Sequence, residues 1–393
     1  MSNDDIFITS IHVNKVRNLE NFDIQLSEEK RQHLIITGKN GSGKTSLLLE
    51  INQFMKELLS ESFHASKALL FNLRFNRNDQ QLIHKLYTDK TDLGKYQVSC
   101  YFNNFLSVGK NYLYVFFESK RINLPKLPNG ITKVNLKNAS IDSKINVHFI
   151  QFIVNLKVER SLARDENEHE AARQIDEWFE RFENHLKNLF DAPDLRLEFD
   201  RKNYNFHIRI GDNEPFAFNE LSDGYSAVIS IVTELILRME ATGNKAYDQQ
   251  GIVLIDEIET HLHVALQKKI MPFLCDFFPN VQFIVTTHSP FVLSSISNAV
   301  ICDLETKEII TDLSGYSYTA LIESYFDTDK YSQKIKEKIA RFEELSTKKT
   351  LNEQEEDEQD ELKHYFNNLP KFYADELEVK LQQIRLQTMA RKG

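Results

Sequence analysis

The segment Gly38-Lys39-Asn40-Gly41-Ser42-Gly43-Lys44-Thr45 constrains this chain more than any other, because it is a complete GxxxxGK(S/T) loop. The apolar run His33–Thr37 before it predicts a buried strand, and Ser46–Leu59 after it has the apolar spacing of a helix. The glycines let successive backbone N–H groups point at phosphate oxygens, and the helix adds the positive end of its dipole. We therefore predict a P-loop that binds ATP and Mg²⁺, with Lys44 on the β- and γ-phosphates and the Thr45 hydroxyl on the metal. The residues expected to contact ATP here are Gly38, Lys39, Asn40, Gly41, Ser42, Gly43, Lys44, Thr45 and Ser46.

A second signal is the apolar run Ile252–Ile255, which is followed by Asp256 and Glu257. Open α/β sheets bind ligands at the carboxyl ends of their strands, where these two acids are expected to lie. Asp256 is predicted to hold Mg²⁺, directly or through water, and Glu257 to polarise the attacking water. A strand that ends in two acids also describes an ordinary turn, so the catalytic interpretation depends on the P-loop upstream.

The third signal is Leu221-Ser222-Asp223-Gly224-Tyr225, which opens a predicted helix with Ser222 34 residues before Asp256. It resembles the signature of ABC ATPases, LSGGQ and its LSxG variants, in which the Ser hydroxyl and the helix N-terminus bind the γ-phosphate held by the opposite subunit. The resemblance implies that Ser222, Asp223 and Gly224 contact ATP, and that the chain works as a homo-oligomer, a dimer or a multiple of dimers. The alternative is an ordinary helix start, with Ser222 as N-cap and Asp223 in the first turn. Asp223 and Tyr225 replace the Gly and the Gln or Glu of the family pattern, which predicts slow hydrolysis.

His288 follows another buried run, 32 residues after Asp256. At this place ABC ATPases carry the switch histidine that contacts the γ-phosphate, so the resemblance implies a catalytic role for His288. The segment Glu259-Thr260-His261-Leu262-His263 resembles the one after the acidic strand in the RecF-like and overcoming-lysogenization (OLD) branch of the ABC/SMC ATPases. We interpret it as a subunit-contact loop rather than a second metal site. Gln151 is the one candidate for a Q-loop glutamine.

Four segments resemble bacterial defence ATPases, among them the ATPase subunits of Septu systems and the retron-associated ATPases. The segments are Phe117–Arg121, Asn219–Ala227, Asp256–His263 and the stretch beginning at Gly315. The resemblance implies a sensor and scaffold subunit that controls a separate HNH-type nuclease, with DNA as a further candidate ligand. The alternatives are a RecF-like DNA-repair ATPase and a self-contained OLD-type nuclease. The latter needs a strand-borne Glu and a DxD, and the one DxD after His288, Asp327-Thr328-Asp329, falls on a predicted helix or its loop, so no intrinsic nuclease activity is expected.

These motifs together predict an α/β fold, an ABC-type P-loop ATPase head with a helical insertion and C-terminal helices. The expected parts are 1–60, the N-terminal half of the head with the P-loop; 61–190, an insertion, mixed then helical; 191–312, the C-terminal half; and 313–393, a helical segment. At the N-terminus, Ile6–Val16 and Phe22–Leu26 read as strands joined by a turn over 17–21. Lys44 and Ser222 are 178 positions apart, and the sequence between them contains no heptad array, unlike the coiled coils of SMC proteins.

Composition narrows the setting in which these motifs work. The net charge of −10 disfavours non-specific binding of nucleic acid by the whole surface. The three cysteines lie far apart without a zinc spacing, which fits a reducing cytosol. The acidic start of the chain does not resemble a signal peptide, and no apolar stretch approaches the ~20 residues of a membrane span. A cytoplasmic protein with no membrane partner is expected.

Overall fold

The computed structural model describes residues 5–60, 97–104, 108, 112–121, 125–128, 130–134, 136, 140, 142–243, 247–315, 333–348 and 351–367. The chain divides into two compact units, residues 1–316 and 317–393. Residues 61–96 of the predicted insertion lie outside the described residues, as do the Asp327–Asp329 segment and the tail from residue 368.

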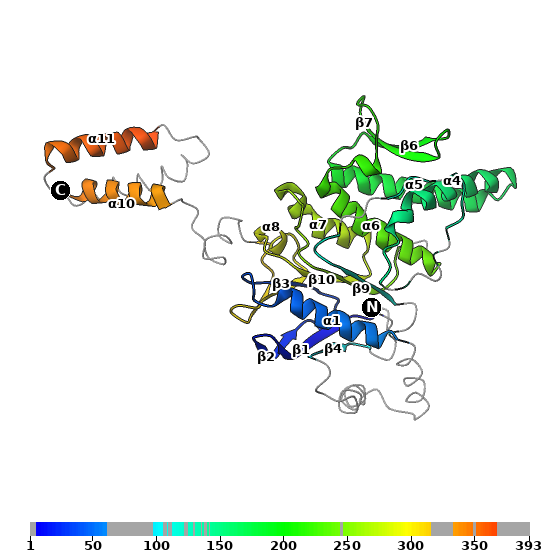
Figure 1. The fold of residues 1–393 in the computed structure, drawn as a ribbon, viewed down its shortest axis with the longest axis horizontal. Coiled ribbons are helices and arrows are strands. Elements are labelled where there is room, and N and C mark those ends of the chain that lie inside the picture. The colour runs from blue at the N-terminus through cyan, green and yellow to red at the C-terminus, as the bar shows by residue number, and fades with distance from the viewer. Residues whose placement is uncertain are drawn as a thin grey trace. The chain divides into compact units, whose positions relative to one another are not determined.

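A six-stranded sheet forms the centre of the first unit (Figure 1). Its strands β9 and β10 are mostly apolar and completely buried, as expected for parallel strands covered on both faces. Five of the strands run parallel, and only β12 pairs antiparallel with its neighbour β11, so the sheet is mixed. In the order in which they lie side by side, the strands are β12 (Glu308–Thr311), β11 (Ala299–Asp303), β3 (His33–Thr37), β10 (Val281–Thr286), β9 (Gly251–Ile255) and β5 (Leu113–Phe117).

A second sheet is antiparallel and has the order β2 (Leu19–Gln25), β1 (Ile8–Val16) and β4 (Val98–Phe102). The helix α1 (Lys44–Leu58) lies between this sheet and the central one (Figure 1), and its apolar face joins both in one hydrophobic core. The predicted turn over 17–21 is too long. Val16 pairs with Leu19 across the hairpin, Arg17 adopts the left-handed conformation at φ 52°, and β2 begins immediately afterwards.

Helices cover the other side of the central sheet (Figure 1). The antiparallel helices α4 (Phe149–Asp165) and α5 (His169–Phe190) pack against each other, and α5 also contacts α7 (Val264–Phe277). Their core is aromatic: Trp178 stacks on Phe182, which in turn contacts Phe149. No helix in the described part of the chain is both long and apolar enough to cross a membrane. The remaining elements of this unit are η3 (Asn146–His148), β6 (Leu195–Asp200), β7 (Asn205–Ile210), β8 (Phe216–Ala217), η4 (Phe218–Glu220), α6 (Asp223–Ala241), α7 (Val264–Phe277) and α8 (Pro290–Leu293).

The second unit contains the helices α10 (Gln333–Thr347) and α11 (Glu353–Asn367). They share a small hydrophobic core of their own, and the Arg341 guanidinium spans from one helix to the Glu358 carboxylate of the other. Because five apolar side chains are buried between these helices, the charged C-terminal segment contains a packed helix pair. The buried side chains are Ile339, Phe342, Leu345, Leu362 and Phe366.

Candidate ATP-binding and hydrolysis site

The predicted P-loop connects β3 to α1, as the sequence pattern requires. Gly38, Gly41 and Gly43 have φ of 133°, 85° and 103°, values that residues with a side chain rarely adopt. At Gly38 a Cβ atom would also lie 2.9 Å from the Ser42 hydroxyl oxygen. Gly43 is the N-cap of α1, so the loop ends where the backbone N–H groups of the helix begin. The chain therefore has a backbone that curls as a phosphate cradle must.

Lys44 lies in this loop with its side chain folded back over the backbone. It is only 6% exposed, and its Nζ donates to the carbonyl oxygens of Gly38 at 2.8 Å and Lys39 at 3.1 Å. Burial lowers the pKa of the Lys44 amine, while the carboxylates that follow β9 and that of Asp303 on β11 act in the opposite direction. The Lys44 amine is thus held against the loop by two hydrogen bonds, and the negative charges of the acids after β9 act on it.

The structure brings the two predicted metal ligands together. The Thr45 hydroxyl donates to the carboxylate of Asp256, 3.2 Å from Oδ1 and 3.1 Å from Oδ2. Thr286, at the end of β10, donates to Oδ1 of the same carboxylate at 2.6 Å and accepts the backbone N–H of Glu257 at 2.7 Å. Hydroxyl and carboxylate oxygens are the hard donors that Mg²⁺ prefers. In the same loop the Ser42 hydroxyl is buried and has no hydrogen-bond partner among the described residues, so the donor set fits a Mg²⁺–nucleotide complex.

Glu257 and His288, the predicted catalytic pair, also come from the carboxyl ends of neighbouring strands. Glu257 has φ 45°, and its Oε2 accepts a hydrogen bond from the Thr260 hydroxyl at 3.3 Å. The backbone N–H of His288 donates to Oε1 of Glu259 at 2.6 Å. Burial, followed by the positive charge of Lys44, lowers the pKa of His288, which favours a neutral ring near pH 7. Both residues therefore lie at the carboxyl ends of the parallel strands, where the P-loop also begins.

The predicted signature residues lie at the start of α6. Ser222 is the N-cap residue by position, but its side chain makes no capping hydrogen bond, and both Ser222 and Asp223 are exposed. Among the described residues, no hydrogen bond joins Ser222, Asp223 or Gly224 to the P-loop or to the acids after β9. Gly224 is buried, and a Cβ atom there would lie 3.0 Å from the carbonyl oxygen of His261. Tyr225 stacks on Phe190 at 4.1 Å, which places the residue that departs from the family pattern in a packing contact.

Two other sequence candidates have ordinary surroundings. The Gln151 amide donates to the Gly130 carbonyl at 3.0 Å and to Asn155 at 3.2 Å, neither of which belongs to the P-loop or the acidic strand. His261 and His263 are exposed, and within the described ranges no group of three His, Cys, Asp or Glu side chains is arranged to hold a metal ion.

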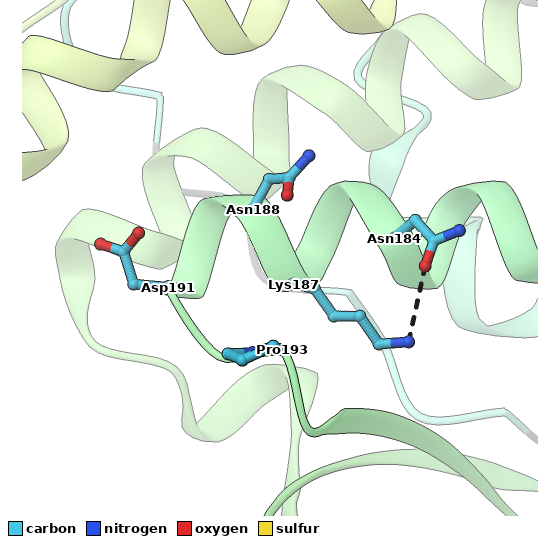
Figure 2. Close-up of a pocket in the computed structure, with 5 residues that line it drawn as sticks. All are labelled: Asn184, Lys187, Asn188, Asp191 and Pro193. Carbon is cyan, nitrogen blue, oxygen red and sulfur yellow. Dashed lines mark hydrogen bonds between the residues drawn. The ribbon is translucent and has the colours of Figure 1, made fainter.

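A surface hollow of about 620 Å³ lies at the C-terminal end of α5, and none of its lining residues belongs to the P-loop (Figure 2). Its charged groups are already paired, since Lys187 contacts Glu183 at 2.9 Å and Asp191 contacts Lys269. Figure 2 also shows the Lys187 amine directed toward the Asn184 amide oxygen, 3.5 Å away. The hollow has no glycine loop and no acidic pair, so it does not resemble a nucleotide site. It is lined by Asn184, Lys187, Asn188, Asp191 and Pro193.

Three polar contacts of this site were not predicted from the sequence. Thr286 bridges Asp256 and Glu257, Glu259 holds the backbone of His288, and Arg121 donates to the carbonyls that follow β9. A polar residue that closes an apolar strand was a visible signal for Thr286. No pattern along the chain points to the other two contacts, because their partners lie 29 and more than 130 residues away.

The P-loop between β3 and α1, with two acids after a parallel strand of the same mixed sheet, defines an α/β P-loop fold, which is the fold class predicted for this chain. Residues 117–294 match the family model described as "AAA domain, putative AbiEii toxin, Type IV TA system". The chain is similar to Septu protein PtuA of Bacillus mycoides (strain KBAB4), with 25% identity over 352 residues, 81% of this chain and 44% of that protein. This similarity confirms the resemblance to Septu ATPase subunits.

Two further proteins are similar over part of the chain. Retron Ec83 probable ATPase of Escherichia coli is 38% identical over 90 residues, which are 22% of this chain and 17% of that protein. The chain thus spans less than half the length of both curated relatives. A solved SMC head bound to the C-winged helix domain of ScpA aligns with a TM-score of 0.41 and 15% identity, covering 76% of this chain and 94% of that chain.

Proposed function

We propose that this chain is a defence ATPase that binds and hydrolyses Mg²⁺–ATP between two copies of itself and thereby regulates a separate nuclease. The observation that carries the proposal is the cluster of Thr45, Asp256 and Thr286 beside a glycine loop whose lysine is buried at its mouth. The similarity to PtuA and to a retron ATPase supports the assignment to antiphage defence.

Each residue of the site has a task in this proposal. The P-loop amides and Lys44 bind the phosphates, and Thr45 and Asp256 hold the ion, which neutralises charge on the phosphates when it is bound. Thr286 holds the Asp256 carboxylate in place and accepts the backbone N–H of Glu257, so it fixes both acids with one hydroxyl. Glu257 acts as the general base toward water, and the neutral ring of His288 contacts the γ-phosphate from the neighbouring strand.

The proposed assembly rests on the exposure of Ser222. The P-loop and the acids lie together, whereas Ser222 is exposed at the start of α6 and its hydroxyl makes no capping bond. A helix N-terminus with an uncommitted hydroxyl and a glycine close behind is suited to bind an anion. We infer that Ser222 serves the nucleotide of a second copy, so that the working unit is a dimer or a multiple of dimers. The departures at Asp223 and Tyr225 support slow turnover.

The partner is proposed from chemistry and similarity together. Every catalytic group that can be assigned on the described residues serves ATP, which leaves the cutting of nucleic acid to another protein. We propose an HNH-type nuclease as that protein, as the resemblance to Septu systems implies; the similarity to PtuA supports the resemblance itself.

Two substitutions test the ATPase. Lys44→Ala should abolish ATP binding, because the amine and the backbone cradle act on the same phosphates. Glu257→Gln should bind ATP normally while turnover falls by about 10²- to 10⁴-fold, the range that one general base contributes. Glu198→Gln, in the exposed pair with Arg209 on β6 and β7, is the matched control and should turn over at the parental rate. Nucleotide binding and phosphate release measure both steps; an unmodified chain that binds no ATP would refute the proposal, and parental turnover of Glu257→Gln would place the base elsewhere.

A further inference from the structure

Arg121 is a buried cation that the ATPase scheme leaves without a task. It lies four residues after β5 and is only 3% exposed. The strand end that precedes it is tied to the acidic strand, because the backbone N–H of Asp256 donates to the carbonyl of Phe117 at 2.8 Å. Arg121 thus enters the site from the neighbouring strand, just behind the two predicted catalytic acids.

The guanidinium of Arg121 binds three successive carbonyl groups of the turn after β9. Its Nη1 donates to the carbonyls of Asp256 at 2.9 Å and Glu257 at 3.2 Å. Its Nη2 donates to the carbonyls of Glu257 at 3.2 Å and Ile258 at 2.6 Å. These carbonyls lie where the chain leaves the sheet, so they lack the strand partners that satisfy buried backbone groups. The planar fork of arginine can satisfy several of them at once, which the single ammonium of lysine cannot do in the same geometry.

The turn that Arg121 binds has a conformation that needs support. Glu257 lies at φ 45°, a sparsely populated region for a residue with a side chain, and such residues persist where their surroundings hold them. Burial lowers the pKa of Arg121 to about 10, and the carboxylate of Glu259 is the strongest influence in the opposite direction. The guanidinium is therefore still charged near pH 7, and acidic side chains of the same turn balance its charge.

We propose that Arg121 is a positioning residue that locks the turn 256–258, so that the Asp256 carboxylate faces Thr45 and the Glu257 carboxylate is held for catalysis. This inference rests on the proposed ATP hydrolysis. Arg121 acts through the backbone: its four hydrogen bonds go to carbonyl oxygens, which leaves both carboxylates available to their own partners. The same hydrogen bonds hold the start of the segment that leads to Glu259. The Glu259 carboxylate in turn accepts the backbone N–H of His288.

The test compares Arg121→Gln and Arg121→Lys with a matched control, Arg238→Gln. Arg238 is also largely buried and also anchors a loop, because it pairs with Glu234 at 2.8 Å and donates to the Ser143 carbonyl at 2.6 Å, away from the acids. Loss of either guanidinium should lower overall stability. Only loss of Arg121 should act on the turn 256–258.

Hydrogen exchange of the full chain without nucleotide is the first measurement, because it does not depend on ATP hydrolysis. Amides of residues 256–262 should exchange about tenfold faster or more in Arg121→Gln, and remain at the parental rate in Arg238→Gln. Parental exchange of these amides in Arg121→Gln would overturn the proposal. If Arg121→Gln does not fold, Arg121→Lys should show the same local increase to a smaller extent, and parental exchange there would overturn it equally.

Steady-state kinetics is the second measurement. In Arg121→Gln, kcat should fall about tenfold or more, with KM for ATP within about threefold of the parental value and Arg121→Lys in between. A parental kcat in Arg121→Gln, or an equal loss in Arg238→Gln, would refute the positioning role. If the unmodified chain itself hydrolyses no ATP, the proposed function fails, and hydrogen exchange still decides whether Arg121 holds the turn.

Discussion

His33 should make the stability of the first unit depend on pH, because it is buried as a neutral ring in the strand that leads into the P-loop. The backbone N–H of Phe283 donates to its Nδ1 at 3.1 Å, so the neutral ring must carry its hydrogen on Nε2, which lies 3.3 Å from the Cys275 sulfur. Burial, together with the positive charge of Arg31, lowers the pKa of His33 from 6.5 to about 4. A proton on Nδ1 would place an N–H donor of His33 opposite the N–H donor of Phe283. This is unfavourable, which agrees with the lowered pKa of His33.

The magnitude follows from the two pKa values. The unfolded chain takes up the proton as the pH falls below 6.5, whereas the folded chain does so only near pH 4. The stabilising contribution is therefore complete above 6.5 and is lost as the pH falls through about 4. The difference between these pKa values corresponds to about 3 kcal/mol in all, of which about 2 kcal/mol is lost between about pH 7.5 and about pH 5.

The assay is equilibrium unfolding in urea, followed by the fluorescence of Trp178. This residue is the single tryptophan of the chain and is buried in the first unit. In His33→Asn, an amide oxygen can still accept the Phe283 N–H but cannot titrate, so the loss between about pH 7.5 and about pH 5 should shrink by about 2 kcal/mol. Carboxylates that titrate in the same range are common to both proteins and cancel in the comparison. An equal pH dependence in both proteins would refute the assignment to His33.

The other predictions concern assembly and partners. Mixing Lys44→Ala and Ser222→Arg chains should recover ATPase activity, because a mixed dimer retains one composite site with both motifs intact; a fully active monomer at high dilution would contradict this. The full-length chain, free of partners, should not cut DNA in Mg²⁺, and a co-purified nuclease would be the control. Deleting residues 331–393 should weaken binding to the proposed partner nuclease, and full-strength binding would place the docking surface in the insertion instead.

The parts of the site that the sequence predicted are those that local chemistry dictates. Gly41 and Gly43 have positive φ, which glycine adopts more readily than other residues. The buried strand β9 is recognisable from an unbroken apolar run. Pairing of strands is not local. The strand β4 joins β1 through a register of Ile11 with Cys100, which no periodicity along the chain specifies. The predicted turn of the first hairpin was too long for the same reason, since strand pairing is not local. Lys15 and Glu20 pair across the hairpin at 2.6 Å, so the strand pairing continues into the residues predicted as a turn.

The contacts that the sequence did not predict are polar and long-range. Thr286 reaches Asp256 from a neighbouring strand, and Arg121 reaches the carbonyls after β9 from the far side of that strand. In both cases the need arises from folding itself, since a buried carboxylate and a turn that leaves the sheet must find hydrogen-bond partners. The hydrogen-bond partner of the carboxylate or of the turn comes from the neighbouring strand of the sheet. It can therefore be identified only when the strand order is known.

The glycine of the signature segment has a packing role that bears on how ATP sites on two copies would communicate. A side chain at Gly224 would meet the carbonyl of His261 at 3.0 Å and Leu266 at 3.3 Å, so the start of α6 lies directly against the segment that follows the proposed catalytic acids. In the proposed dimer, Ser222 would bind the nucleotide of one site while Asp256 and Glu257 serve the other. A shift of α6 on binding one ATP would press on the turn that carries the acids of the second, because a closely packed contact transmits displacement. This also decides which substitution tests the composite site: Gly224→Ala would disturb both sites at once, whereas Ser222→Arg alters an exposed side chain and leaves the packing within its own chain intact.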